Sequence, residues 1–272
     1  MSALAAPSGE SSGRLTRPDR PVLAWRQTAG DGPTIVFFPG YASDMTGSKA
    51  QSLFDWAQVN RCNCLLFDYA GCGQSEGRFE DETLETWRDD ALDIIADRVP
   101  RGPLILVGSS MGGWLMLLVA LAISERIAAL VGIAAAPDFT DWGYSDKQKT
   151  VLAKDGRLYE DNVYGPEPTL TTLTLWQSGE RNRLLDGAIS LDCPARLLHG
   201  QADGDVPSAI SLRLAAALRS AEVRTLLIKD GDHRLSRPQD IALLIATVEE
   251  LLTRHPREGG DPSPAVTSSS SG

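Results

Sequence analysis

The sequence of 272 residues contains little cysteine, little histidine and fewer basic than acidic residues. Its four cysteines form no Cys-x-x-Cys pair, so we expect neither a disulfide framework nor a structural zinc site, and we infer a reducing compartment. Twenty-six basic residues against thirty-six acidic ones give a net charge of −10. This charge argues against nucleic acid or an anionic membrane surface as the partner.

Long apolar runs are also missing. The longest candidate, residues 114–123, has about half of the ~20 residues that a membrane-spanning helix needs, so no integral membrane segment is expected. Residues 1–20 lack the apolar stretch of a secretory signal peptide. Their three arginines hint at a transit peptide, but Glu10 and Asp19 argue against one, and we therefore expect a cytoplasmic protein.

What is present is an alternation of short apolar runs with amphipathic stretches, flanked by polar ends. Residues 1–20 and the Ser- and Pro-rich residues 255–272 are predicted to be a flexible segment and a disordered tail. The alternation over 21–254 predicts one α/β domain with a mostly parallel sheet and helices on both faces. The predicted strands are 34–38, 64–68, 104–108, 129–133, 195–199 and 223–228, and the predicted helices are 48–59, 84–99, 111–124, 207–220 and 237–253.

Residues 137–191 interrupt this rhythm with a long polar segment that contains several tryptophans and tyrosines. Long insertions in compact domains are usually functional. We therefore predict that this segment forms a cap over a site.

A Gly-x-Ser-x-Gly motif is the strongest chemical signal. The apolar run 104–108 leads through Ser109 and Ser110 directly into the predicted helix, the context in which such a serine projects from a strained turn and acts as a nucleophile. Gly108 and Gly112 must then be small because strand and helix pack together there. Ser109 lacks the paired glycines and is the weaker candidate.

A serine hydroxyl needs a base, and imidazole has a suitable pKa. Only three histidines are available. His255 lies beside the predicted tail, and His199 ends a strand before a turn, where a packed or turn-bonding histidine is expected. His233, in the polar loop before the last helix, is therefore the predicted base.

The third member of such a triad is a carboxylate that follows the serine and precedes the histidine in the chain. Asp203 lies in the loop after a predicted strand and is the preferred candidate. Asp205 is an alternative, although it could instead cap the next helix. Asp138, which follows an earlier strand, is a further alternative.

Hydrolysis of an acyl group also requires backbone amides that bind the oxyanion. Met111, directly after Ser110, is expected to supply one. The loop after the first predicted strand contains Pro39 and Gly40, and we assign the second amide to Tyr41.

These motifs, in this order, resemble the α/β-hydrolase superfamily from about Pro21 to Thr253. Residues 67–75 are similar to its DxxGxGxS loop, and residues 199–207 read HGxxDxxVP around the acid. Residues 39–50, 108–116 and 197–200 resemble more narrowly the mitochondrial palmitoyl-protein thioesterase and acyl-glucuronide esterase group and its bacterial relatives. In that group the triad corresponds to Ser110, Asp203 and His233, whereas Pro39 departs from the wider superfamily, in which many members have histidine.

The predicted function is a serine hydrolase for carboxylic esters or thioesters that works through an acyl-enzyme and needs no metal or organic cofactor. The alternatives are a peptidase or amidase of the same fold and a receptor for small molecules without catalysis. Trp114 and the cap aromatics are candidates for an acyl pocket, although Trp114 could equally be core. Because no basic cluster is evident, small or lipid-like acyl groups are favoured over acyl-CoA.

Overall fold

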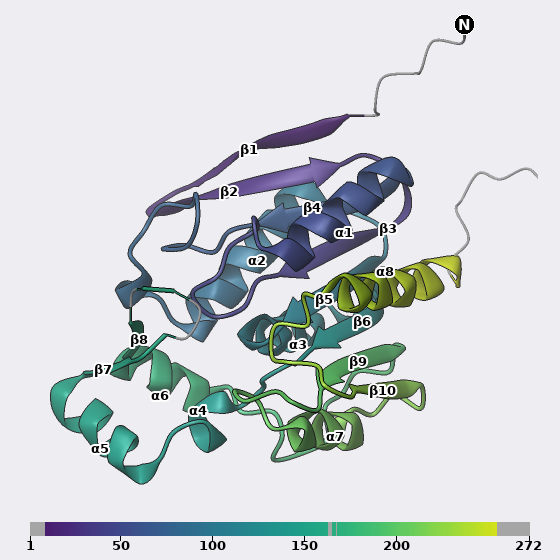
Figure 1. Cartoon of the computed structure of the whole chain (residues 1–272). Coiled ribbons are helices and arrows are strands. Elements are labelled where there is room, and N and C mark those ends of the chain that lie inside the picture. Colours follow the sequence, from purple (N-terminus) through teal and green to yellow (C-terminus); the bar gives the residue numbers. More distant parts are fainter. Residues whose placement is uncertain (1–8, 163–164, 167, 255–272) are drawn as a thin grey trace, which may run out of the picture.

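The centre of the molecule is an eight-stranded sheet with the strand order β1-β2-β4-β3-β5-β6-β9-β10 (Figure 1). The computed structural model describes residues 9–162, 165–166 and 168–254. β2 runs antiparallel to both β1 and β4, and the strand pairs from β4 to β10 are parallel. The strands are β1 Glu10–Arg17, β2 Arg20–Thr28, β3 Asp31–Phe38, β4 Cys62–Phe67, β5 Leu104–Ser109, β6 Ile127–Ile133, β9 Ala195–Gly200 and β10 Val223–Ile228. The fold class predicted from the alternating pattern is confirmed.

The N-terminal prediction needs a correction, because residues 10–17 are not a flexible segment but form the edge strand β1. This strand pairs with β2 over most of its length. At its end Arg17 is buried, and its guanidinium donates to Asp90 at 2.5 Å and to Asp93 at 3.0 Å. This polar segment therefore forms a strand through its pairing with β2, and the ion pair of Arg17 fixes its end to the helix that carries Asp90. Residues 1–8 and the predicted tail 255–272 lie outside the described residues.

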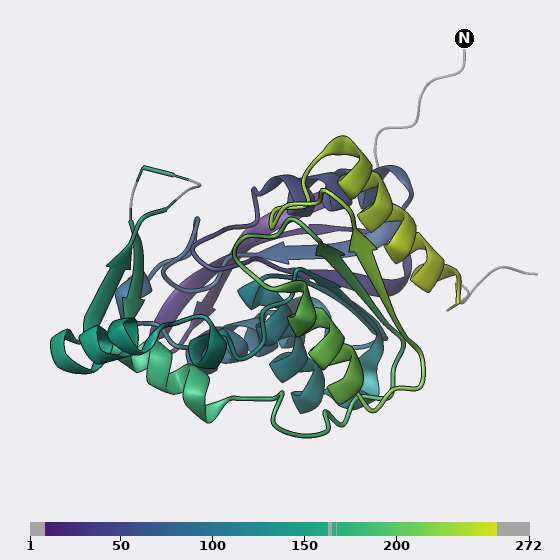
Figure 2. The same cartoon turned by 60° about the horizontal axis from the view of Figure 1, so that its bottom comes forward.

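Helices cover both faces of the sheet (Figure 2). Those on one face, α1 and α8, pack against Ile35 and Phe37 of β3, and those on the other, including α2 and α3, pack against Val36 and Phe38. Alternate residues of one strand therefore point into two different cores, which explains why the strands read as continuous apolar runs. The helices are α1 Ser48–Val59, α2 Leu84–Arg98, α3 Met111–Ala122, α7 Ser208–Ala217 and α8 Pro238–Thr253.

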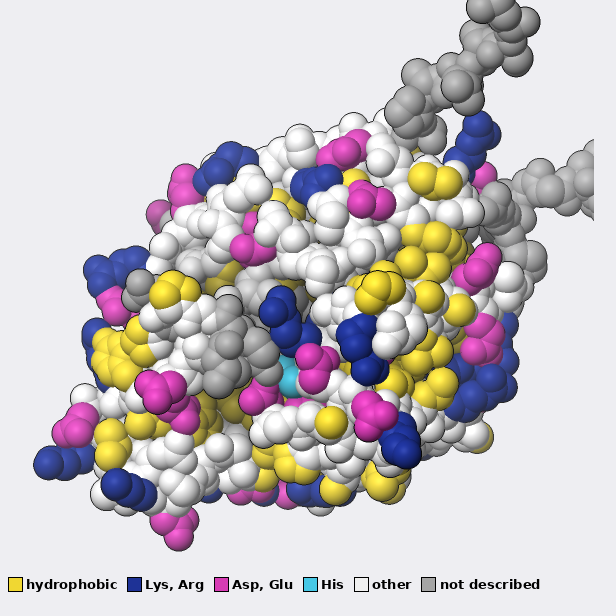
Figure 3. Space-filling view, in the orientation of Figure 1, with side chains coloured by type: hydrophobic (Ala, Val, Ile, Leu, Met, Phe, Trp, Pro, Cys, Tyr) yellow, Lys and Arg dark blue, Asp and Glu magenta, His cyan; other side chains and the backbone are white. Residues whose placement is uncertain are grey.

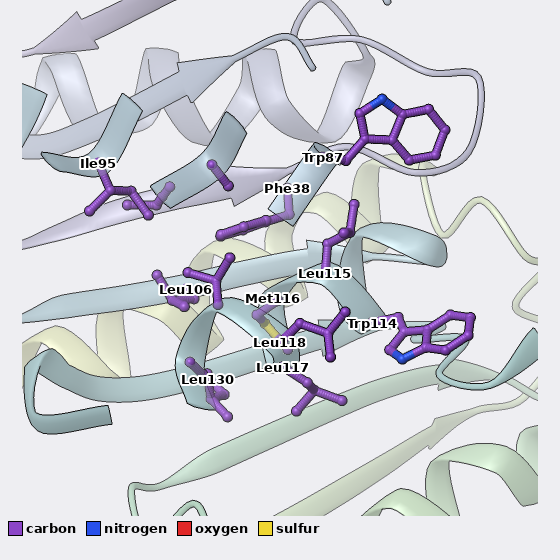
Figure 4. Packing of buried hydrophobic residues seen from close by; sticks show 14 of the residues in the cluster. Phe38, Trp87, Ile95, Leu106, Trp114, Leu115, Met116, Leu117, Leu118 and Leu130 are labelled. Atoms are coloured by element: carbon purple, nitrogen blue, oxygen red, sulfur yellow. The ribbon is translucent and has the colours of Figure 1, made fainter. Parts of the chain in front are cut away.

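The interior around α3 contains the largest side chains. Figure 4 shows Trp114 and its neighbours Leu115 to Leu118 packed beside Phe38, Leu106 and Leu130. The indole of Trp114 is fully buried and donates its N–H to the carbonyl of Asn182 at 3.1 Å. Of the two interpretations of Trp114, the structure favours the core, where it anchors the chain as it leaves the insertion.

The insertion between β6 and β9 forms its own small layer, seen at the lower left of Figure 1. It contains the helices α4 Phe139–Trp142, α5 Asp146–Asp155 and α6 Leu173–Arg181 and the antiparallel hairpin of β7 Arg157–Glu160 and β8 Thr169–Thr172. We call this segment, residues 137–191, the cap. Among the described residues, no helix is long and apolar enough to cross a membrane.

Candidate active site

Ser110 lies in a strained turn between β5 and α3. Its backbone has φ 55° and ψ −124°, a conformation that non-glycine residues rarely adopt and that is typical of a nucleophile elbow. The turn is held by hydrogen bonds in which the Ser110 amide donates to the Ile133 carbonyl at 2.9 Å and the Ser110 carbonyl accepts from Ala136 at 3.0 Å. The hydroxyl thus stands at the carboxyl edge of the parallel strands, where ligand sites of open α/β sheets form.

The glycines on either side of Ser110 are required by close backbone approach. A Cβ atom at Gly108 would lie 2.5 Å from the carbonyl oxygen of Gly112, and one at Gly112 would lie 2.1 Å from that of Phe38. No side chain fits at these distances. The motif therefore places the first turn of α3 directly against β5 and the loop after β3.

His233 approaches Ser110 from the loop between β10 and α8. Its Nε2 lies 3.1 Å from the Ser110 hydroxyl, and its Nδ1 lies 2.9 Å from Oδ2 of Asp203. A donor meets an acceptor in both contacts when Nδ1 carries the proton and Nε2 accepts from the hydroxyl. The structure therefore brings the three residues singled out from the sequence into one hydrogen-bonded series.

Asp203 is almost completely buried, with 1% of its side chain exposed. Burial by itself opposes the charge, but donors from His199, His233 and the Val206 amide outweigh it and hold the pKa of this carboxyl well below its usual range. Oδ1 also accepts from the amides of Asp205 at 2.9 Å and Val206 at 2.8 Å. The carboxylate is therefore ionised and held in a fixed orientation.

The two alternative candidates for the triad acid, Asp205 and Asp138, lie in environments that differ from that of Asp203. Asp205 is exposed beside the cavity, and it does not cap α7, whose N-cap residue is Pro207. Asp138 is buried and accepts from the amides of Leu184 at 2.8 Å and Leu185 at 2.7 Å. Asp138 therefore joins the end of the cap to its beginning, and within the described part of the chain its carboxylate bonds these backbone amides rather than an imidazole.

The other two histidines also differ from His233. His199 is fully buried and bonds the turn after β9 through the Val206 carbonyl at 2.9 Å, as expected from the sequence. His255 lies outside the described residues.

The residues proposed to bind the oxyanion, Tyr41 and Met111, both line the same cavity as Ser110. A Cβ atom at Gly40 would lie 3.2 Å from the Ser109 carbonyl, so the loop after β3 passes close to the elbow. The Tyr41 hydroxyl donates to the carbonyl of Leu170 in β8 at 2.6 Å. Its ring packs against Phe139 of the cap and against Phe79 before α2, so this loop is fixed to the cap and to the main domain.

A cavity of about 540 Å³ opens above Ser110 and His233, between the elbow, the His233 loop and the cap. Figure 3 shows the hollow on this face, with a histidine side chain exposed between basic and acidic side chains. The apolar lining includes Phe37, Met111, Ala136, Phe139, Trp142 and Val206, and the charged lining comprises Lys49, Arg234, Asp44, Glu160, Asp161 and Asp205. The cavity can thus hold an apolar chain while its rim carries both signs of charge.

Asp203, Asp205 and His233 also have potential metal-ligating atoms within 4.8 Å of one another. However, both oxygens of Asp203 and Nδ1 of His233 already take part in the hydrogen bonds described above. A metal ion would have to displace these bonds. The cluster is therefore better explained by the hydrogen-bonded series than by a metal centre.

Sequence reasoning missed two features of this site. One is a contact of His199 with Asp203, whose atoms Nε2 and Oδ2 lie 3.3 Å apart; the spacing of four residues after a strand could have suggested it. The other is Lys49, on the first turn of α1, whose ammonium donates to the Arg234 carbonyl beside His233. No sequence signal links the two segments that carry this pair.

Comparison with known proteins gives a consistent result. The family described as alpha/beta hydrolase fold matches residues 33–174. A human protein named palmitoyl-protein thioesterase ABHD10, mitochondrial, is 38% identical over 249 residues, which cover 88% of this chain and 79% of the human protein. The corresponding mouse protein is 39% identical over 245 residues, which cover 88% and 82%. The resemblance drawn from residues 39–50, 108–116 and 197–200 is therefore confirmed.

Solved structures agree with this comparison. The mouse alpha/beta hydrolase domain-containing protein 10 superimposes with a TM-score of 0.83 at 37% identity, covering 90% of this chain and 99% of that one. A protein of Agrobacterium vitis S4 gives a TM-score of 0.84 at 35% identity, with the same coverage.

The comparisons overturn the predicted location. The sequence led us to expect a cytoplasmic protein, but the human, orangutan and bovine relatives are all named as mitochondrial proteins. The prediction was wrong because it rested on the composition of residues 1–20, and a few charges in a short segment are a weak guide to location.

Proposed function

This chain belongs to the α/β-hydrolase family, and from that premise we propose that Ser110, His233 and Asp203 form a catalytic triad that hydrolyses carboxylic esters or thioesters. The observation that carries the proposal is the hydrogen-bonded series itself, with 3.1 Å between Ser110 and His233 and 2.9 Å between His233 and Asp203. The series lies at a cavity large enough for a small-molecule or acyl substrate.

In the proposed first half-reaction the Ser110 oxygen attacks the acyl carbonyl, and Nε2 of His233 takes the hydroxyl proton. The ionised Asp203 stabilises the resulting imidazolium through Nδ1. The amides of Tyr41 and Met111 bind the oxyanion of the tetrahedral intermediate. His233 then returns the proton to the departing oxygen or sulfur, which leaves an acyl group on Ser110.

In the second half-reaction a water molecule takes the place of the leaving group. His233 removes a proton from the water as it attacks the acyl-enzyme, and the same amides bind the second oxyanion. Collapse of this intermediate returns the proton to Ser110 and releases the carboxylic acid. Every proton transfer thus passes through one imidazole nitrogen.

The substrate class that we favour is the long-chain thioester. Relatives at 37–39% identity are named palmitoyl-protein thioesterases, and the apolar residues around Ser110, among them Phe139 and Trp142, suit an acyl chain. An apolar chain gains free energy when it leaves water for such a surface. We therefore propose acylated thiols ahead of short oxygen esters.

The test is hydrolysis of two matched series, S-acyl thioesters and p-nitrophenyl esters from acetyl to palmitoyl, together with one aminoacyl anilide. We expect wild-type turnover to rise with chain length in the thioester series. Ser110→Ala should lower kcat by at least about 10³-fold, because the nucleophile is lost while the fold is kept.

The matched control is Ser109→Ala, the neighbouring serine in the same cavity, which should keep kcat within about threefold of wild type, as expected for a residue outside the triad. Turnover confined to the anilide would replace the proposal with a peptidase. Turnover that survives in Ser110→Ala, or silence across all substrates, would refute it.

A further inference from the structure

A second histidine stands behind the proposed triad. His199, near the end of β9, is fully buried. Its Nε2 lies 2.9 Å from the Val206 carbonyl and 3.3 Å from Oδ2 of Asp203. Its Nδ1 lies 2.6 Å from the hydroxyl of Ser211, a residue of α7 that is also buried.

The surroundings of this ring favour one tautomer. Neither the Val206 carbonyl nor the ionised Asp203 carboxylate can donate a hydrogen bond, so Nε2 must carry the proton. A single proton there leaves Nδ1 as an acceptor for the Ser211 hydroxyl. The Ser211 hydroxyl therefore donates to Nδ1 and holds the ring in the orientation that presents the Nε2 N–H to Asp203.

This N–H completes the set of donors around the Asp203 carboxylate. Oδ1 accepts from the amides of Asp205 and Val206, and Oδ2 accepts from His233 and from His199. Without His199, His233 would be the only donor to Oδ2 among the described residues, and His233 is the ring that Asp203 has to orient. The contact with Val206 also ties the same imidazole to the turn that carries Asp203.

We propose that His199 is a positioning residue that holds Asp203 in the orientation that His233 requires, with Ser211 holding the His199 ring in place. The proposal rests on the proposed function, because positioning has a catalytic consequence only where Asp203 orients the base. His199 does not itself line the cavity, and its bonds among the described residues are to Asp203, Ser211 and the backbone carbonyl of Val206 rather than to Ser110, so it acts on the base through Asp203 and the turn that carries it. Loss of its N–H should therefore lower kcat and leave KM nearly unchanged.

The experiment compares His199→Leu with His199→Gln in the full chain, assayed with the wild type's best thioester. Leucine removes the donor, and glutamine keeps an amide N–H that can reach the position of Nε2. We expect kcat of His199→Leu to fall about tenfold or more with KM within twofold, and His199→Gln to recover most of the loss. Equal kcat values for the two variants would overturn the proposal, because a purely steric role gives no advantage to the donor.

Ser211→Ala provides an independent test that removes only one hydroxyl. It should lower kcat about threefold to tenfold with KM nearly unchanged, because Nδ1 then loses its buried hydrogen-bond partner and the ring is held less firmly against Asp203. An unchanged kcat in Ser211→Ala would contradict the proposed role of Ser211 in holding His199. The wild type and Ser110→Ala, assayed in parallel, separate the two proposals: Ser110-dependent turnover with a wild-type kcat in His199→Leu refutes only the role of His199.

Discussion

At the scale of single residues, the site depends on backbone positions where a side chain does not fit. Gly112 lies on the first turn of α3, and a Cβ atom there would meet the carbonyl oxygens of Phe38 at 2.1 Å and Pro39 at 2.4 Å. Both carbonyls belong to the segment that leads to Tyr41. A change at Gly112 therefore acts on the elbow and on the proposed oxyanion loop together.

We expect Gly112→Ala to lower the free energy of unfolding by about 1–3 kcal/mol, the usual cost of forced overpacking, and to lower kcat more than it raises KM. Urea unfolding and steady-state kinetics measure the two effects. Gly187→Ala is the control, because nothing lies within 4 Å of a Cβ atom at that position. Equal free energies of unfolding for the two variants would show that the close backbone approach at Gly112 does not exclude a side chain.

Lys49 gives a prediction about pH. Burial, together with the charge of Arg234, lowers its pKa from the usual 10.5 to about 8. Between these two values the unfolded chain binds the proton and the folded chain does not, so the stability rises with pH in this window. The free energy of unfolding of the wild type should therefore increase relative to that of Lys49→Met from pH 8 to 10.5. Lys49→Arg, which stays charged throughout, should show no such rise, and a flat difference for both variants would contradict the burial of this ammonium.

The sequence was sufficient to single out Ser110, His233 and Asp203 because each lies in a loop of recognisable type and histidines are few. It could not reveal the contact of His199 with Asp203. That contact depends on how α7 is turned, since Ser211 must face β9, and on the path of residues 203–206. Such geometry follows from tertiary packing, which a local pattern does not record.

At the scale of elements, the cap and the proposed oxyanion loop are joined by one side chain. The Tyr41 hydroxyl donates to the Leu170 carbonyl of β8, while the Tyr41 backbone lies in the loop after β3. Burial raises the pKa of this hydroxyl well above its usual value, so it stays a donor at any physiological pH. The β7–β8 hairpin is thereby tied to the loop that faces Ser110.

We expect Tyr41→Phe to lower kcat about threefold to tenfold, less than the loss of a whole oxyanion donor, and to cost about 1 kcal/mol of stability for one hydrogen bond. Tyr144→Phe is the matched control. The Tyr144 hydroxyl also bonds β8, through the Thr171 hydroxyl at 2.9 Å, but the Tyr144 backbone lies in the cap and not in the oxyanion loop. That variant should lose similar stability and keep kcat. The same kcat in both variants would show that the bond from Tyr41 to the cap does not affect the oxyanion loop.

Most sheet and helix positions followed from the sequence, and α1 was predicted with the bounds that the structure has. The N-terminal hairpin was missed because β1 is mostly polar and β2 contains only the short apolar run of residues 22–25. It is fixed instead by pairing with β4 and by the ion pairs of Arg17 with Asp90 and Asp93. The cap was recognised only as an insertion, because its short elements gain their stability from contacts with one another and with α2.

At the scale of the whole molecule, charge bears on the choice of thioester. The chain carries a net charge of −10, and four acidic residues line the cavity against the two cations Lys49 and Arg234. Such a field repels a polyanion at long range and is screened by salt. The inference drawn from composition, that acyl-CoA is disfavoured, therefore remains a prediction for the folded protein.

We expect kcat/KM for palmitoyl-CoA to be about tenfold or more below that for the neutral palmitoyl thioester of N-acetylcysteamine at low ionic strength. The gap should narrow as salt is added, because long-range repulsion is screened within a Debye length. Assays of both substrates across a salt series measure it. A higher kcat/KM for palmitoyl-CoA at low salt would contradict this prediction, because the attraction of Lys49 and Arg234 for the polyanion would then exceed the repulsion by the acidic residues.

The proposed reaction depends on Ser110 as the nucleophile, activated by His233. The most direct measurement is labelling of the full chain with a fluorophosphonate, followed by mass spectrometry of its peptides. We expect one adduct, on Ser110, that is absent in Ser110→Ala, still present in Ser109→Ala and formed far more slowly in His233→Gln. An adduct on another residue, or no adduct in the wild type, would contradict it.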